Sequence, residues 1–249
     1  MKPKKKQNSS NASVRSQNQF NIEKVHAKNA HVLSRENVFL FIPNLIGYAR
    51  VILAIISLYY MPFAPVKCMS LYSVSCLLDA VDGNVARHLN QCSKFGAVLD
   101  MVTDRSTTTC LLCFLSAIYP SWAIVFQLLI SLDLSSHYMH MYSSLTAGSE
   151  SHKKVSETSN PWLKLYYSNN IVLFTFCAFN ELFFVTLYLL SFDQESYGIE
   201  IPINVIRTLT FISFPICVIK QIINVIQLVG ASQNLAFLDV EERERKREA

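Results

Sequence analysis

Charged residues are scarce in this chain of 249 residues, because Asp, Glu, Lys and Arg make up only 16% of it. Soluble domains carry about 25%. Glycine and proline are also few, with 6 and 8 copies, which excludes a collagen-like chain and disorder for the bulk of the sequence. Apolar residues reach 51%, so a lipid bilayer is expected to surround much of the chain. A soluble nucleic-acid-binding protein is therefore excluded.

Cysteine is present but shows no spacing typical of a disulfide framework. Of the 7 cysteines, only Cys110 and Cys113 form a C-x2-C pair, and this pair lies inside a leucine-rich segment. Neither a second pair nor a nearby histidine accompanies it. The pattern predicts small apolar side chains rather than a redox or zinc site.

Six apolar stretches predict an all-α membrane protein with six transmembrane helices. Most approach the ~20 residues that a membrane-spanning helix needs. The second stretch is short unless its helix continues through the acidic cluster that follows. The segment Ala80–Leu89 contains one glycine and no proline, so we expect the helix to continue through it. The stretches are approximately Val38–Met61, Val66–Val81, Gly96–Tyr119, Trp122–Leu145, Asn169–Phe192 and Ile203–Val229.

The distribution of basic residues predicts the orientation of these six helices. Lysine and arginine are concentrated before the first stretch, between the second and third, in the Thr146–Tyr167 loop and after the sixth. Loops rich in basic residues remain on the cytosolic side, so both termini are expected in the cytosol. We expect a disordered basic tail over residues 1–35, a six-helix domain over 36–238 and a charged C-terminal tail over 239–249.

Four aspartates lie at the predicted cytosolic ends of the second and third helices. Asp79 and Asp82 are three residues apart, and Asp100 and Asp104 are four apart. Each pair therefore lies on one helix face. A short turn joins the two helices, so they are antiparallel neighbours and the two carboxylate faces can meet.

Four carboxylates that face one another repel unless cations lie between them. Oxygen ligands suit Mg²⁺ or Mn²⁺. Four carboxylates can bridge two such ions about 3.5–4 Å apart, an arrangement used for displacement at phosphorus. The alternative is a set of ion pairs within the membrane with Arg50, Arg87 and Arg105, but ion pairing does not require two helical pairs of acids.

Small and basic residues beside the acids favour a phosphate-bearing ligand. Gly83 follows an acid directly and allows close approach of a bulky group. Ala86 keeps the same face open one turn later, and Gly96 is expected to clear space on the opposite helix. The guanidinium of Arg87 can bind a phosphate.

This segment reads Asp79-x2-Asp82-Gly83-x2-Ala86-Arg87-x8-Gly96-x3-Asp100-x3-Asp104, and it resembles the signature of the CDP-alcohol phosphatidyltransferase family without a substitution. The resemblance implies a six-span membrane enzyme that transfers a phosphatidyl or related group from a CDP-linked donor to an alcohol and releases CMP. It implies that Asp79, Asp82 and Asp100 bind metal, and that Asp104 reaches the metal and acts as general base. Donor contacts are implied for Gly83, Arg87 and Ser93.

Further stretches resemble the eukaryotic branch of this family that uses CDP-diacylglycerol and myo-inositol. The resemblance runs from about Asn37 to Leu238. It implies inositol as acceptor, an endoplasmic reticulum membrane location and a homodimer. The stretches that carry it are Phe39–Arg50, Leu77–Gly83, Leu99–Arg105, Ser131–His137 and Gly148–Lys153.

The acceptor site is less clearly marked in the sequence. Inositol needs several hydrogen-bonding groups, and Asp133 and His137 lie four residues apart on one face of the predicted fourth helix. We expect them to line an acceptor pocket, although structural contacts are the alternative for the histidine. The following loop offers Ser149, Glu150, His152 and Lys153. Glu181 is expected to pair with a cation such as Arg207 or Lys220, with its role left open.

Three other functions compete with this interpretation. Sibling enzymes use glycerol phosphate, choline, ethanolamine or serine as acceptor, and the signature does not separate them. A small ion-coupled transporter could also use acids within the membrane, but these acids cluster at one depth and the chain has no internal repeat. A structural membrane-shaping protein would not need the four acids.

Overall fold

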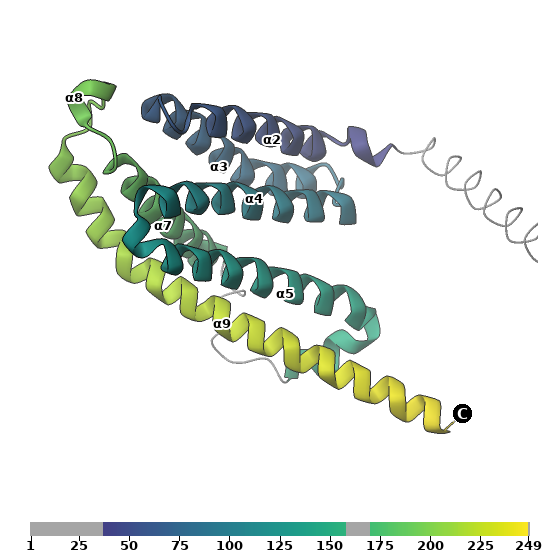
Figure 1. Cartoon of the computed structure of the whole chain (residues 1–249). Helices are drawn as coiled ribbons and strands as arrows, with labels where there is room; N and C mark the ends of the chain where they lie inside the picture. Colours follow the sequence, from purple (N-terminus) through teal and green to yellow (C-terminus); the bar gives the residue numbers. More distant parts are fainter. Residues whose placement is uncertain (1–36, 158–169, 249) are drawn as a thin grey trace, which may run out of the picture.

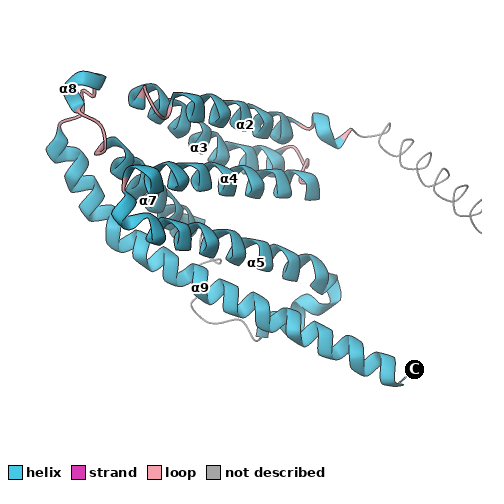
Figure 2. Cartoon of the chain, viewed as in Figure 1, coloured by secondary structure: helices cyan, strands magenta, loops and turns pink. Residues whose placement is uncertain are grey.

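The computed structural model describes residues 37–157 and 170–248, with backbone only for 147–157 and 170. Every regular element in these ranges is helical and none is a strand (Figure 2), which confirms the all-α prediction. The elements are η1 (Val38–Leu40), α2 (Ile42–Tyr60), α3 (Pro65–His88), α4 (Lys94–Ile118), η2 (Pro120–Trp122), α5 (Ala123–Glu157), α7 (Asn170–Leu189), α8 (Gln194–Tyr197) and α9 (Ile203–Glu248).

Helix α3 continues through the acidic cluster to His88, as the sequence predicts. The chain then reverses through Asn90, whose φ of 54° lies in the left-handed region that asparagine tolerates better than most residues. Ser93 begins α4 as its N-cap, and its hydroxyl oxygen accepts a hydrogen bond from Gly96 N–H at 2.9 Å. This short turn places the two acidic helix segments side by side.

Two helices are longer than the apolar stretches suggest. Helix α5 runs to Glu157, so the first part of the expected Thr146–Tyr167 loop is helical. Helix α9 runs to Glu248, and the expected boundary at residue 238 lies inside it. The apolar pattern ends before these helices do, because their last turns are polar. The expected N-terminal tail lies outside the described residues.

The helices form two groups that share α4. Helix α2 packs on α3 and α4, whereas α5 and α7 both pack on α9, and α4 contacts α5 and α7. The chain turns by 119° between α4 and α5. Figure 1 shows that the start of α2, the α3–α4 turn and the ends of α5 and α9 lie toward the same end of the molecule.

The interior is apolar at one end of the bundle and polar at the other. Leu111, Leu115, Phe184 and Tyr188 belong to an apolar core in the half away from the α3–α4 turn. The inward stripe of α9 is mostly polar toward the other half, as its buried residues are Ile206, Ser213, Cys217, Lys220, Asn224, Gln227 and Ala231. Such a stripe is the reverse of that in a soluble helix.

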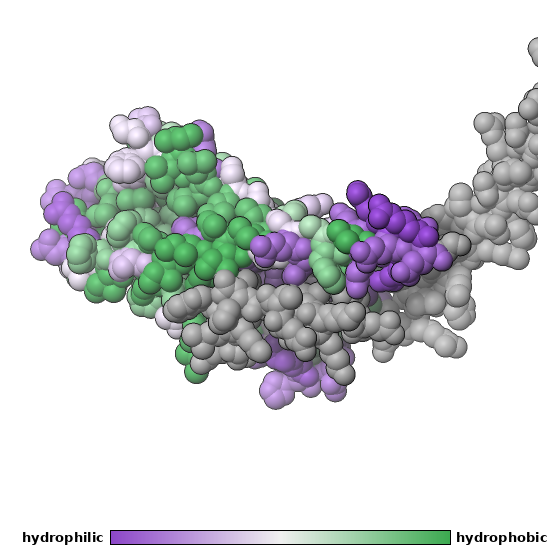
Figure 3. All heavy atoms as spheres, turned by 90° about the horizontal axis from the view of Figure 1, so that it is seen from below, coloured by the Kyte–Doolittle hydropathy of each residue, from purple (hydrophilic) through white to green (hydrophobic). Residues whose placement is uncertain are grey.

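The exterior is widely apolar, with large exposed side chains such as Phe211, Ile222 and Val225 on α9. Figure 3 shows hydrophobic side chains covering much of one face, with hydrophilic groups toward both ends. Three helices of the described chain are long and apolar enough to cross a membrane: α2, Ile171–Leu189 of α7, and α9. Helices α4 and α5 qualify only as one bent pair, because both contain polar side chains. The fold is therefore that of a helical membrane protein.

Candidate active site

The four predicted aspartates meet between α3 and α4. Carboxylate oxygens of Asp79, Asp82 and Asp100 lie within 4.8 Å of one another. Asp104 follows one turn further along α4. The i,i+3 and i,i+4 spacings thus place one face of each helix toward the other, as expected from the sequence.

Arg50 from α2 lies at the centre of this group. Its Nη1 atom is 2.6 Å from Asp79 Oδ1, 2.9 Å from Asp82 Oδ2 and 2.6 Å from Asp100 Oδ1, and its Nη2 atom is 2.5 Å from Asp104 Oδ1. The side chain is only 2% exposed. One buried guanidinium therefore pairs with all four acids.

Close packing of α2 brings Arg50 to this position. Gly47, one turn earlier, faces α4 so closely that a Cβ atom there would lie 2.9 Å from Leu99 Cδ2. The hydroxyl of Ser75 on α3 donates to the carbonyl oxygen of Arg50 at 3.2 Å. Sequence reasoning named Arg50 only as an alternative ion-pair partner, since its place opposite both acidic faces depends on this packing.

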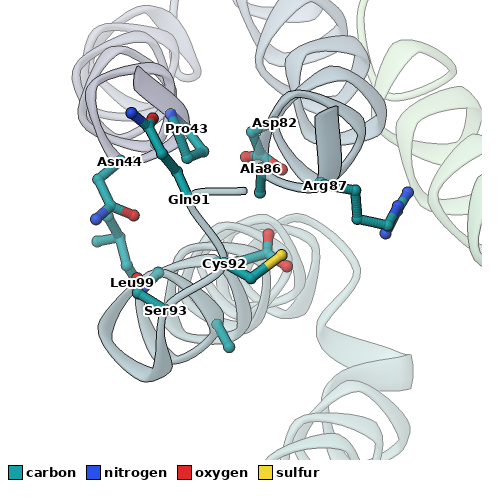
Figure 4. Close-up of a pocket in the computed structure, with 14 residues that line it drawn as sticks. Pro43, Asn44, Asp82, Ala86, Arg87, Gln91, Cys92, Ser93 and Leu99 are labelled. Atoms are coloured by element: carbon teal, nitrogen blue, oxygen red, sulfur yellow. The ribbon is translucent and has the colours of Figure 1, made fainter. Parts of the chain in front are cut away.

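A pocket of about 210 Å³ opens beside the acids. It is lined by the first turn of α2, the last turns of α3 and the start of α4 (Figure 4). All five residues predicted to bind the donor line it, together with Asp82 and Asp100: Gly83, Ala86, Arg87, Ser93 and Gly96. The structure thus brings the predicted donor residues to one place.

The predicted donor residues differ in how they face the pocket. A Cβ atom at Gly83 would meet only the Arg87 guanidinium, at 3.8 Å. Arg87 extends to one side (Figure 4) and donates to Asn84 Oδ1 at 2.7 Å. At Gly96 a Cβ atom would lie 2.6 Å from Asn44 Oδ1, so this glycine permits α4 to pack on α2 in addition to lining the pocket.

Two further polar side chains of the pocket were not singled out from the sequence. Gln91 Oε1 accepts a hydrogen bond from Ile42 N–H at 3.0 Å, which fixes the α3–α4 turn to the start of α2. Asn44 Nδ2 donates to the Val38 carbonyl oxygen at 2.6 Å. Asn44 lies outside the acidic signature, and Gln91 is one of its unspecified positions. The position of α2 brings both into the site.

The predicted acceptor residues form a second polar cluster beside the first. Asp133 is buried, and Arg105 Nη1 lies 3.0 Å from its Oδ1 atom and 3.2 Å from His137 Nε2. Arg105 follows Asp104 directly, and its Nη2 atom lies 3.7 Å from Asp104 Oδ2. The acceptor candidates are therefore linked to the acidic cluster by a single side chain.

Helix α9 contributes groups that sequence reasoning did not assign to this cluster. Asn224 Nδ2 lies 3.4 Å from Asp133 Oδ1, and Lys220 Nζ donates to Asn224 Oδ1 at 2.5 Å. Their spacing of four residues, which places both on one face of a helix within the membrane, was the available signal.

The closest hydrogen-bond partners of Glu181 are hydroxyl groups, and of the two cations expected beside it Lys220 interacts with it electrostatically. Glu181 accepts hydrogen bonds from Tyr72 at 2.5 Å and Thr108 at 2.9 Å, whereas Arg207 is exposed at the start of α9. Helix α4 packs on α7, and the long side chain of Tyr72 reaches the same carboxylate from α3. Side chains of the other candidates lie outside the described residues: Ser149, Glu150, His152 and Lys153.

The acidic cluster fits a hard divalent cation. Its donors are carboxylate oxygens from two helices, close enough to share one cation, and the guanidinium of Arg50 shows that they do so. Oxygen-only donor sets suit Mg²⁺ and Mn²⁺. The described residues can therefore hold a metal ion at this place.

Comparison with known proteins agrees with this geometry. Residues 40–231 match the family model for CDP-alcohol phosphatidyltransferase. The chain is 54% identical to a Schizosaccharomyces pombe protein, over 83% of this chain and 93% of that protein. Identity to a Saccharomyces cerevisiae protein is 50% (86% and 94% covered), and to a human protein 47% (85% and 99% covered).

All three relatives are named CDP-diacylglycerol–inositol 3-phosphatidyltransferase. No solved structure matches the chain. The family model covers most of the described helices, including every residue of the acidic cluster and its pocket. The chain belongs to the CDP-alcohol phosphatidyltransferase family.

Proposed function

We propose that this chain transfers the phosphatidyl group of CDP-diacylglycerol to myo-inositol, giving phosphatidylinositol and CMP. The observation that carries the proposal is the convergence of four aspartates from two adjacent helices beside a pocket that contains Arg87. The names of relatives 47–54% identical over most of the chain support both substrates.

Asp79, Asp82 and Asp100 are the proposed metal ligands, and Asp104 is the fourth. We propose Mg²⁺ or Mn²⁺, with two ions shared among these carboxylates. Bound there, the ions would neutralise the pyrophosphate of the donor and stabilise CMP as the leaving group. The proximity of the carboxylate oxygens supports this assignment.

Asp104 is the proposed general base. Its Oδ1 atom accepts from Arg50, whereas Oδ2 lies 3.7 Å from Arg105, beyond hydrogen-bond distance, and can accept a substrate proton. The proton of an inositol hydroxyl moves to this carboxylate as the hydroxyl oxygen bonds to the phosphorus that bears diacylglycerol. The bond from that phosphorus to the CMP oxygen breaks, and CMP keeps the electron pair.

The pocket beside Asp82 is the proposed donor headgroup site. Gly83 and Ala86 leave room for the pyrophosphate, and Arg87 can turn from Asn84 to bind a phosphate oxygen. Ser93 and Gly96 line the opposite wall. The pocket volume of about 210 Å³ suits part of a headgroup, so the acyl chains would remain in lipid.

Asp133 and His137 are the proposed acceptor residues. Arg105 orients both, and Asn224 and Lys220 add polar groups from α9. An acid and a histidine within a membrane bundle need a partner or a ligand to offset the cost of burial. A ring of hydroxyls is a suitable ligand, because it can both donate to the carboxylate and accept from the cations.

We further propose six crossings, with α2, α3, α4, α5, α7 and α9 as the spans and both termini in the cytosol. The start of α2 and the ends of α5 and α9 lie toward one end of the molecule, which supports this topology (Figure 1). The acids of α3 and α4 then lie near the cytosolic surface of the endoplasmic reticulum membrane. Assembly as a homodimer is part of the same proposal.

An acceptor panel tests the reaction. Purified protein with CDP-diacylglycerol and Mg²⁺ or Mn²⁺ should incorporate inositol at least about 100-fold faster than glycerol phosphate, serine, choline or ethanolamine. A site that hydrogen-bonds several hydroxyls of one ring leaves polar groups unpaired when an alcohol with fewer hydroxyls binds. CMP release and labelled lipid are measured, and EDTA should abolish both. Preferred incorporation of another alcohol would move the chain to a sibling activity. Ion flux without CMP release would favour the transporter.

Substitution of the base tests the assignment of Asp104. Asp104→Asn keeps an oxygen for Arg50 but cannot take a proton, so turnover should fall by about 10²–10⁴-fold while donor affinity changes little. Turnover and CDP-diacylglycerol binding are measured in parallel. Asp193→Asn, at the N-cap of α8, is the control for loss of one carboxylate and should keep wild-type turnover. Wild-type turnover in Asp104→Asn would refute the assignment.

Asp133→Asn tests the acceptor site. Loss of a charge-assisted hydrogen bond should raise the KM for inositol by about 10–100-fold and leave the KM for CDP-diacylglycerol nearly unchanged. Steady-state kinetics with each substrate varied in turn give both values. Ser131→Ala, an exposed position on the same helix, is the control. A rise confined to the donor KM would place Asp133 outside the acceptor pocket.

A further inference from the structure

Arg50 joins three helices at the acidic cluster and lies outside the Asp79–Asp104 signature. Its two terminal nitrogens contact four carboxylates at 2.5–2.9 Å. Its Nε atom is buried without a hydrogen-bond partner in the described part of the chain. In the described part of the chain, the side-chain contacts of the guanidinium are therefore all with the acids.

The repulsion among the four carboxylates explains why the cluster needs a cation even without a metal ion. Asp82 and Arg50 are buried. Carboxylates whose oxygens lie within 4.8 Å of one another repel strongly where water is excluded. One guanidinium offsets part of this repulsion but leaves the cluster with excess negative charge. The site therefore holds together and still attracts further cations.

The contacts of Arg50 also define a competition. Its Nη1 atom contacts the same three side chains whose oxygens lie close enough to share a metal ion, namely Asp79, Asp82 and Asp100. A carboxylate lone pair directed at a guanidinium is not directed at a metal. Arg50 and a divalent ion must therefore share or exchange these oxygens.

We propose that Arg50 is the resident counter-cation of this site. It holds the four carboxylates together in metal-free protein, and divalent ions bind in competition with it. This inference rests on the metal site of the proposed function. Arg50 is thus a positioning residue that sets metal affinity through the aspartates. The shape of its side chain matters, since a planar guanidinium has several donors, whereas a lysine ammonium is a single point charge.

Two measurements on Arg50→Gln in detergent micelles test the proposal. In EDTA, the Tm should fall by about 10 °C relative to wild type, because removing one partner of a buried ion pair leaves the others uncompensated. Mn²⁺ affinity, measured by electron paramagnetic resonance of free Mn²⁺, should become at least about tenfold tighter, because the competing charge is gone. Saturating Mn²⁺ should recover most of the lost Tm.

Arg207→Gln is the matched control, because it removes one arginine charge from an exposed position at the start of α9. It should keep the wild-type Tm and Mn²⁺ affinity. The proposal would be overturned if Arg50→Gln bound Mn²⁺ no more tightly than wild type and its Tm loss were the same at saturating Mn²⁺ as in EDTA. Arg50 would then be a purely structural residue.

Arg50→Lys keeps the test valid if Arg50→Gln does not fold. It retains the charge but cannot span four carboxylates, so Mn²⁺ should bind about three- to tenfold more tightly than in wild type. Wild-type or weaker affinity in this variant would contradict the proposal. Failure of wild-type protein to bind Mn²⁺ would instead refute the metal site of the proposed function.

Discussion

The mutual repulsion of four carboxylates between α3 and α4 is the constraint on which the rest of the structure depends. Asp79, Asp82, Asp100 and Asp104 can lie together in a membrane bundle only if a cation lies among them. Arg50 meets this need from a third helix. The position of α2 is therefore tied to the site, and close contacts at Gly47 and Gly96 allow it to approach.

The same principle accounts for the wider interior. Apolar side chains face outward on α9, and polar ones face the bundle, because lipid accepts the former and each buried polar group needs a partner. Arg105 connects Asp104 to Asp133 and His137, so two polar clusters form one continuous region. That continuity would let a donor and an acceptor meet at Asp104.

Local pattern was enough to predict the helices and the meeting of the acids. Spacings of three and four residues determine a helix face, and the short turn at Asn90 makes α3 and α4 neighbours. The role of Arg50 and the hydrogen-bond partners of Glu181 could not be predicted, because both depend on which helices pack together far apart in the sequence. The length of α5 was underestimated because its last turns lack the apolar residues by which a span is recognised.

The most direct test of the central claim is to detect metal ions among these four aspartates. Pulsed electron paramagnetic resonance of Mn²⁺-loaded protein should show two magnetically coupled ions per chain. In Asp82→Asn, the coupled signal should disappear, because α3 then offers one carboxylate fewer to the ions. Absence of bound Mn²⁺ in the wild type, or a coupled signal that survives this substitution, would contradict the account.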